Sequence, residues 1–335
     1  MIDVRSRAAE VYGRVLDVYE RCLYYSFHTT AGYLRQGVAA RLRSHGVSPY
    51  VEFFRSLFPE GAGYRHDQLD ARTELSDEQR DVEPPNADSH LAFMAGGLDA
   101  CVSYRMHRPG PVCLIDLDGV YKGQPRRRQT LLVGYNHERV VARTKLEVPV
   151  SAHPIDAINL KEPRLGLYEQ LADFLAAHEV PHGRVRLDLA PGEQHSSLTI
   201  NEYETLLMRH DLVEVLRDPL RFALQTARHA VTDPAAVPFR AIEYAKYDFP
   251  QTLNRLVDAL GLGQSRVERL LARALALPAE RFLRMRRSVS LPVSNALASA
   301  CGHLVEGTYQ SPILVQWRSA PRGVRTVNVT LTRFD

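Results

Sequence analysis

Residues 128–148 read RQTLLVGYNHERVVARTKLEV, and this stretch carries the clearest strand pattern in the chain. Two apolar, β-branched runs flank a short polar segment, Asn136 to Arg139, of the kind that forms a tight turn. A third apolar run, VCLIDL at 112–117, precedes them. We therefore predict three consecutive strands that form an antiparallel β-meander at the centre of the fold.

The segments on either side of this centre predict mostly helices. Residues 3–58 repeat apolar side chains at three- and four-residue steps. The C-terminal half is mostly helical in pattern, with one strand at 183–190 and a closing hairpin made by 312–319 and 325–334. The predicted fold class is α+β: N-terminal helices, a central antiparallel β-meander, and a helical C-terminal half closed by a β-hairpin.

The domain organisation follows from a change in composition. Residues 59–89 hold nine acidic residues against three arginines and predict an acidic loop or linker. We therefore expect an N-terminal helical region at 1–58, this linker at 59–89, and an α+β main domain at 90–335. No repeated segment is apparent in the sequence.

The composition describes an ordinary globular chain with one skew. The 335 residues carry a net charge of +3, and the 42 basic residues include only four lysines, so 38 are arginine. No apolar stretch is long enough for a transmembrane helix, and the N-terminus lacks a signal-peptide pattern, so we expect a soluble, cytoplasmic protein with no membrane partner. Four scattered cysteines predict neither a disulfide framework nor a zinc site.

One local motif resembles a known enzyme family. VCLIDLDGVYKG at 112–123 places Asp116 and Asp118 after an apolar strand, and so resembles the first motif of the haloacid-dehalogenase-like hydrolases. The resemblance covers about ten residues and implies a magnesium-dependent phosphatase, in which Asp116 attacks phosphorus and Asp118 is the general acid/base. The family's later acidic pair has no counterpart, since residues 265–334 contain only three acidic side chains.

Two polar loops offer groups for acid–base chemistry. His153 and Asp156 lie in a proline-framed loop, and Glu193 and His195 lie in a loop after the strand at 183–190. Loops at strand ends commonly carry catalytic groups, and a histidine beside a carboxylate can act as a base near neutral pH. We predict His153 or His195 as the base and Asp156 or Glu193 as its orienting carboxylate.

Basic residues cluster in two places. Residues 121–145 hold seven bases and one acid, including Arg126, Arg127 and Arg128, and residues 265–335 hold eleven arginines and four acids. Such clusters suit phosphate contacts, and tyrosines beside the first cluster could stack on nucleic-acid bases. We assign Arg126 to Arg128 to phosphate binding.

Together these features predict a small-molecule enzyme. The class expected is a group transferase whose donor carries phosphate, such as a nucleotide, coenzyme A, a carrier arm or charged tRNA. The sequence identifies no particular cofactor. Two alternatives stay open: a non-catalytic nucleic-acid-binding protein with RNA as partner, and the phosphatase acting through Asp116 and Asp118.

Overall fold

The computed structural model describes residues 1–42, 46–58, 60–61, 64, 66–72, 75–108, 110–152, 156–203, 286–295 and 302–335. The chain divides into two compact units. Unit 1 contains Met1–Val38, Leu98–Tyr203 and Arg286–Asp335, and unit 2 contains Ala39–Gly97 and Glu204–Met285. Among the described residues, none of the helices has the length and apolar character needed to cross a membrane.

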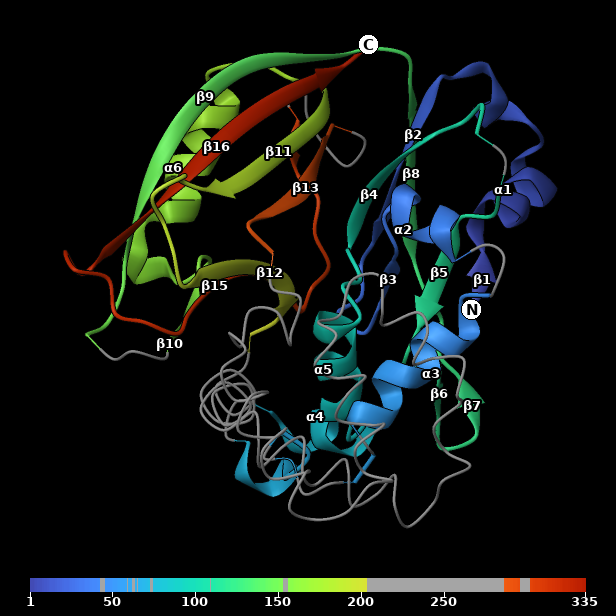
Figure 1. The fold of residues 1–335 in the computed structure, drawn as a ribbon, viewed down its shortest axis with the longest axis horizontal. Coiled ribbons are helices and arrows are strands. Elements are labelled where there is room, and N and C mark those ends of the chain that lie inside the picture. The colour runs from blue at the N-terminus through green and yellow to red at the C-terminus, as the bar shows by residue number, and fades with distance from the viewer. Residues whose placement is uncertain are drawn as a thin grey trace, which may run out of the picture. The chain divides into compact units, whose positions relative to one another are not determined.

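Unit 1 consists mainly of antiparallel strands (Figure 1). Its strands are β1 (Ile2–Asp3), β2 (Arg21–Ser26), β3 (Ala31–Tyr33), β4 (Cys101–Arg105), β5 (Cys113–Asp116), β6 (Val120–Tyr121), β7 (Gln124–Pro125), β8 (Thr130–Tyr135), β9 (Glu138–Pro149), β10 (Asp156–Asn159), β11 (His182–Leu189), β12 (Ser196–Glu202), β13 (Ser288–Ser294), β14 (His303–Leu304), β15 (Gln310–Gln316) and β16 (Val324–Phe334). Its helices are α1 (Val4–Tyr12), η1 (Val15–Val18), η3 (Pro163–Leu165) and α6 (Leu167–Ala176). The strands form five sheets, with the orders β1-β5-β3, β10-β15-β12, β14-β13-β11-β16-β9, β4-β2-β8 and β6-β7.

The five-stranded sheet supplies most of the core of unit 1. Along β11 the side chains alternate between exposed or partly exposed and buried, as expected for a strand with one face on the core. Leu167, Leu171 and Leu175 recur along one side of α6 and pack on the buried valines and leucines of this sheet (Figure 1). The buried face of the sheet, formed by every second residue of its strands, thus packs against the apolar side of α6.

The described part of unit 2 is helical. It contains α3 (Ser48–Leu57), η2 (Leu69–Ala71), α4 (Asp77–Val82) and α5 (Ala87–Ala95), and α2 (Gln36–Arg41) precedes them at the start of the unit. Every residue of α5 is buried, and the Tyr50 hydroxyl of α3 donates to the carbonyl of Gly96 at 2.8 Å. Ser76 and Gln79 form a capping box that begins α4.

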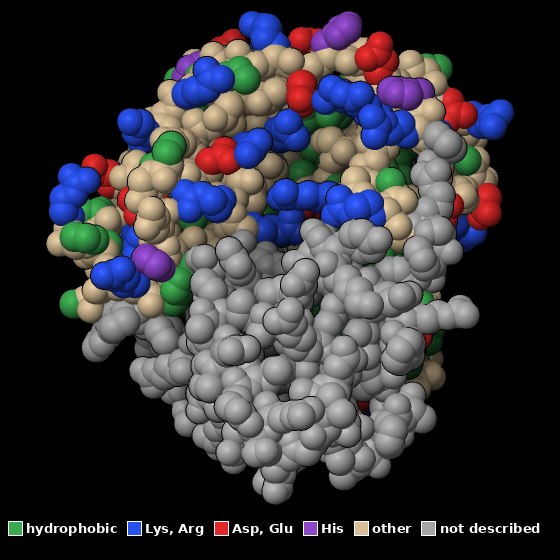
Figure 2. Space-filling view, in the orientation of Figure 1, with side chains coloured by type: hydrophobic (Ala, Val, Ile, Leu, Met, Phe, Trp, Pro, Cys, Tyr) green, Lys and Arg blue, Asp and Glu red, His purple; other side chains and the backbone are tan. Residues whose placement is uncertain are grey.

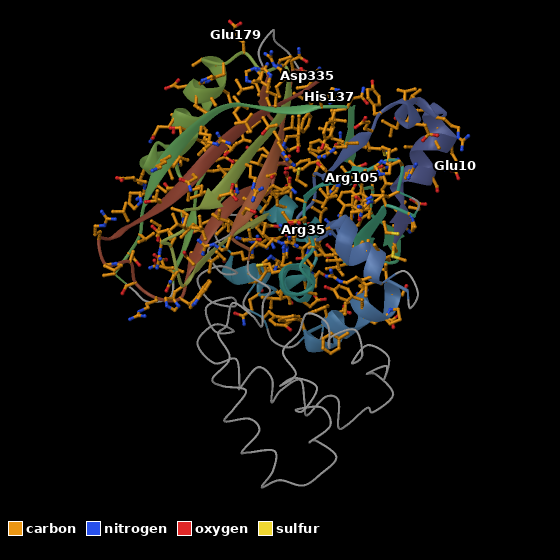
Figure 3. All side chains as sticks on the ribbon, turned by 45° about the horizontal axis from the view of Figure 1, so that its top comes forward. Glu10, Arg35, Arg105, His137, Glu179 and Asp335 are labelled. Carbon is orange, nitrogen blue, oxygen red and sulfur yellow. The ribbon has the colours of Figure 1, made fainter. Side chains whose placement is uncertain are left out.

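The predicted fold class is wrong, because the three central strands do not form a meander. β5 pairs with β1 and β3, β8 pairs with β2, and β9 pairs with β16. The segment between β8 and β9 closes no hairpin, since the amides of Asn136 and His137 donate to the carbonyl oxygen of Asp335. Figure 3 shows His137 and Asp335 close together at this point. Each strand of the sequence pattern therefore belongs to a different sheet.

The predictions for the two ends of the chain are also wrong. The N-terminal helical stripe stops at Tyr12, before Gly13 with φ of 71°, and Cys22 and Leu23 lie in β2. β15 and β16 form no hairpin, since β15 pairs with β10 and β12 while β16 pairs with β11 and β9. The C-terminal half is not a helical layer: the residues described after position 155 form seven strands and α6 among their regular elements. The helices expected within 204–285 lie outside the described residues.

We predict that the stability of the five-stranded sheet depends strongly on one glycine at its centre. Gly183 of β11 lies between β13 and β16, and a Cβ there would collide with the carbonyl oxygen of Thr332. We expect Gly183→Ala to lower the free energy of unfolding by about 3 kcal/mol, because the backbone of β16 cannot retreat without loss of pairing. Gly192→Ala is the control, since nothing lies within 4 Å of its Cβ position. Equal urea midpoints for the two variants would contradict this account.

Candidate functional site

Unit 2 holds a buried group of titratable side chains. His66, which precedes η2, and His90 of α5 are both fully buried, and their ring centroids lie 5.1 Å apart. Ring nitrogens of the two histidines lie within 4.8 Å of each other. Two imidazoles buried this completely are uncommon, because histidine usually keeps part of its ring in contact with water.

His66 is held in place at both ring nitrogens. Its Nδ1 lies 3.2 Å from Oδ1 of Asp67, and its Nε2 lies 3.4 Å from Nη1 of Arg72. A carboxylate accepts hydrogen bonds and a guanidinium group donates them, so these two partners favour the tautomer with the proton on Nδ1 and with Nε2 as the acceptor. Asp67 also accepts the amide hydrogen of Ala87 at 3.0 Å, which ties this loop to the start of α5.

Arg72 supplies a buried positive charge beside His66. Its side chain is 1 % exposed, and Nη1 lies 3.4 Å from Oε1 of Glu83. A guanidinium group on the Nε2 side of His66 repels a metal ion at that nitrogen, while Asp67 occupies the other nitrogen. Both ring nitrogens of His66 thus have hydrogen-bonding partners, which disfavours a metal ion at either of them.

Asp88 adds a carboxyl group with altered acidity. It lies in the first turn of α5 and is buried, and burial is the main reason that its pKa rises to about 6. The negative charge of Asp67 raises the pKa further, while the hydrogen bonds from Ser89 and the charge of Arg55 lower it. Carboxyl groups with raised pKa values collect at catalytic sites, where they serve as acids near neutral pH.

The polar loops predicted from sequence lie at one end of the sheet β10-β15-β12. Asp156 and Ser196 both pair with Gln316, from opposite sides, so the two loops share one edge of that sheet. Two strand spacings separate them, about 10 Å, which is too far for direct hydrogen bonding. His153 lies outside the described residues.

The side chains of these loops are used locally. Oδ1 of Asp156 accepts the amide hydrogen of Ala157, and His195 has a left-handed backbone with φ of 57°. The Glu193 carboxylate binds Arg325 at 3.0 Å and the amide of Thr326 at 2.8 Å. The structure thus pairs Glu193 with an arginine and not with a histidine.

The arginines predicted to bind phosphate face carboxylates. Arg128 donates to both oxygens of Asp116 at 2.7 Å, and Arg126 forms an ion pair with Asp118. Arg127 is exposed. The pair Asp116 and Asp118, expected from the motif resemblance to hold magnesium, is therefore partnered by two guanidinium groups. Figure 2 shows further Lys and Arg side chains gathered across the middle of the visible described surface, with fewer Asp and Glu side chains around them.

His28 lies beside this group and is held as a neutral ring. Its Nε2 accepts the amide hydrogen of Gln129 at 2.7 Å. Burial lowers the pKa of His28 to about 4, the charges of Arg128 and Arg126 lower it too, and Asp116 acts in the opposite sense. A neutral acceptor locked on a backbone amide serves structure more than catalysis.

Sequence reasoning missed the group in unit 2 because its residues lie in the segment treated as an acidic linker. The available signal was two histidine–acid pairs, His66-Asp67 and Asp88-Ser89-His90, within one short stretch. Acidic composition predicts exposure, yet His66, Arg72 and Asp88 are buried. A histidine next to an acid inside an otherwise solvated segment is thus the local pattern that accompanies this buried group.

The raised pKa of Asp88 predicts how stability depends on pH. Because the fold favours the protonated carboxyl group, the free energy of unfolding falls as pH rises from the ordinary value near 3.8 to about 6. Asp88→Asn removes this cost, so at pH 8 the variant should be more stable than the wild type by up to about 3 kcal/mol. Urea unfolding at pH 3.5 and pH 8 measures the difference. A variant that is less stable at both pH values would refute the assignment.

Comparisons with known proteins identify no family. No family model and no curated protein matches the chain. A YbjQ-like protein of unknown function from Sulfolobus solfataricus is 14% identical over 59% of this chain and 99% of its own, with a TM-score of 0.31. A hypothetical protein from Aeropyrum pernix is 16% identical over 57% of this chain and 97% of its own, also at 0.31. Likenesses of this size carry no argument about fold or function.

Proposed function

We propose that the protein is an enzyme in which His66 acts as a general base. The observation that carries this is the buried row Asp67–His66–Arg72, with Nδ1 of the histidine on the carboxylate and Nε2 facing Arg72, so that Nε2 becomes the proton acceptor when the guanidinium group turns to an anionic donor. Asp67 fixes the tautomer and stabilises the imidazolium that forms when His66 accepts a proton. Asp88, with its pKa near 6, is the candidate acid of the same group.

The reaction class we propose is group transfer from a donor that carries phosphate. Arg72 supports this, because a buried guanidinium group next to a base can hold an anionic group near the atom that loses its proton. Arg126 and Arg128 are paired with Asp118 and Asp116, and Arg72 is likewise paired with Glu83, but Arg72 alone of the three lies beside the proposed base, and we favour it for that reason. The transferred group would come from a nucleotide, coenzyme A, a carrier arm or charged tRNA.

Substitution of His66 tests this proposal. We expect His66→Asn to lose at least about 100-fold in turnover, the usual contribution of a positioned base, while the fold measured by circular dichroism is kept. Activity is followed as loss of donor from a panel of nucleotides and coenzyme A thioesters, by phosphorus NMR and mass spectrometry. His137→Asn, at an exposed position, is the matched control and should turn over normally. A His66→Asn enzyme with wild-type turnover would remove His66 from the reaction.

Nucleic-acid binding is a second candidate, supported by one strand. β9 carries Arg143 and Lys145, both exposed and on the same face of the sheet. Arg143 and Lys145 lie next to Thr330 and Asn328 of β16, so polar side chains continue the row across the sheet. A row of cations and hydroxyl or amide groups suits a phosphate backbone.

A salt titration tests the second candidate. Binding to a generic single-stranded RNA should weaken steeply with salt, and Arg143→Gln should reduce the slope by about one unit. Arg7→Gln is the control, because Arg7 already pairs with Glu10 on an exposed helix. The absence of RNA binding at low ionic strength would eliminate this function.

A further inference from the structure

We infer that unit 1 is built from two copies of one fold, and that copy 2 is the partner that covers the outer sheet face of copy 1. Copy 1 contains β1, β2, β3, β4, β5 and β8, and copy 2 contains β10, β11, β12, β13, β15 and β16, in the same chain order. Copy 1 has the strand orders β1-β5-β3 and β4-β2-β8. Copy 2 has β10-β15-β12 and β13-β11-β16, which is the same arrangement strand for strand.

The registers of the paired strands also correspond. In the sheet β1-β5-β3 of copy 1, the directly paired residues Ile2, Leu114 and Tyr33 form one row across the three strands. In the sheet β10-β15-β12 of copy 2, the corresponding row is Ile158, Leu314 and Leu198. The last residue of each row forms an isolated bridge with a residue shortly before the next strand: Tyr33 with Asp99, and Leu198 with Arg286. A shift of one residue in strand pairing would turn every side chain to the opposite face of the sheet. The agreement of the pairing registers in the two copies therefore indicates that one fold is repeated.

A buried arginine occurs at the same place in each copy. Arg128, before β8, donates Nε to Asp116 at 2.7 Å and Nη2 to the carbonyl of Asp118. Arg325 of β16 donates Nε to Gln316 at 3.2 Å and Nη2 to the carbonyl of Arg318. Asp116 ends β5 and Gln316 ends β15, so the acceptors correspond as well as the donors. We call this contact the arginine clip.

The turn after the first strand repeats in the same way. Oδ1 of Asp3, at the end of β1, accepts the amide hydrogen of Arg5, and Oδ1 of Asn159, at the end of β10, accepts that of Lys161. Both basic side chains then reach a main-chain carbonyl of their own copy. Nη2 of Arg5 donates to Met106 O at 3.0 Å, and Nζ of Lys161 donates to Gln310 O at 3.2 Å.

The long insertions have corresponding positions too. Each copy is interrupted between its third and fourth strands, β3 and β4 in copy 1 and β12 and β13 in copy 2. Ala39–Gly97 and Glu204–Met285, which interrupt the two copies, are the two segments that make up unit 2. Unit 1 therefore contains two strand bodies, and unit 2 contains the two insertions.

The copies differ on the outer face of the sheet that contains β2 or β11. In copy 1, Leu23 and Tyr25 are fully buried and belong to the same hydrophobic cluster as the core of copy 2. The Tyr25 hydroxyl donates to Oε1 of Gln310 in copy 2 at 2.6 Å. The corresponding residues of copy 2 are Arg186 and Asp188, with side chains 49% and 28% exposed. Copy 1 thus presents an apolar face that copy 2 covers, whereas the described residues at the same positions of β11 are charged and partly exposed.

Equivalent residues also meet where the copies touch. Asp99 and Arg286 occupy corresponding positions before β4 and β13, and Arg286 forms an ion pair with Asp99. Corresponding residues of two copies contact each other only close to the axis that relates the copies. The pair therefore lies where the two copies adjoin, as in a subunit interface made within one chain.

The experiment compares the two clips in the full chain. We expect Arg128→Ala and Arg325→Ala each to lower the urea midpoint of unfolding, because each leaves the side chain that ends the central strand and the carbonyl two residues later without a donor. Arg127→Ala and Arg322→Ala, at exposed neighbouring positions, should keep the wild-type midpoint. Loss of stability at only one of the two clips would overturn the equivalence.

Substitutions of the acceptor Asp116 provide a second test, which does not depend on whether the arginine variants fold. Asp116→Gln gives copy 1 the acceptor found in copy 2, whereas Asp116→Leu removes the acceptor. We expect Asp116→Gln to keep most of the wild-type midpoint and Asp116→Leu to lose as much as Arg128→Ala. Equal losses for Gln and Leu would show that the two clips are not interchangeable and would overturn the inference.

Discussion

A buried guanidinium group must find acceptors for its hydrogens, and this requirement organises unit 1. The side chains of Arg128 and Arg325 are only 5% and 4% exposed. Arg128, just before β8, reaches Asp116 at the end of β5, and Arg325, near the start of β16, reaches Gln316 at the end of β15. Removing either partner would leave a buried charge or a buried acceptor unsatisfied, which costs far more than the pair contributes. The clip therefore fixes how the two layers of each copy close on each other.

The geometry of the clip also explains part of the preference for arginine over lysine. Arg325 uses three nitrogens to reach Gln316, Glu193 and the carbonyls of Gln194 and Arg318. An ammonium group is a compact point charge and cannot span a planar set of acceptors in this way. Some of the arginines that suggest an anion site in the sequence thus form ion pairs with carboxylates of the chain itself. A cluster of basic residues in a sequence does not show whether its arginines bind an external anion or pair with carboxylates of the same chain. The partner of Arg325 is Glu193, far away in the sequence, and only the fold brings the two together.

The sequence identified elements better than partners. The patterns at 112–117, 128–135, 139–148 and 183–190 match β5, β8, β9 and β11, and LYEQLADFLAAH contains α6. Alternation and amphipathic spacing are local, so they survive without knowledge of the fold. Strand pairing is not local: β9 finds its partner in β16, at the far end of the chain. The repeat stayed hidden for a related reason, since its equivalent residues, such as Leu23 and Arg186, share a register and not a chemical type.

The same reasoning separates the candidate site from the structural charges. Buried charges in unit 1 are matched, as Arg128 with Asp116 and Arg325 with Glu193, and they hold strands together. In unit 2, burial raises the pKa of Asp88, and the like charge of Asp67 raises it further. A fold that only needed stability would gain by replacing such a carboxyl group with an apolar or amide side chain. A group of two acids, two histidines and an arginine within one short, largely buried part of unit 2 is therefore unlike the matched pairs of unit 1, and this difference is the reason that we look for chemistry there.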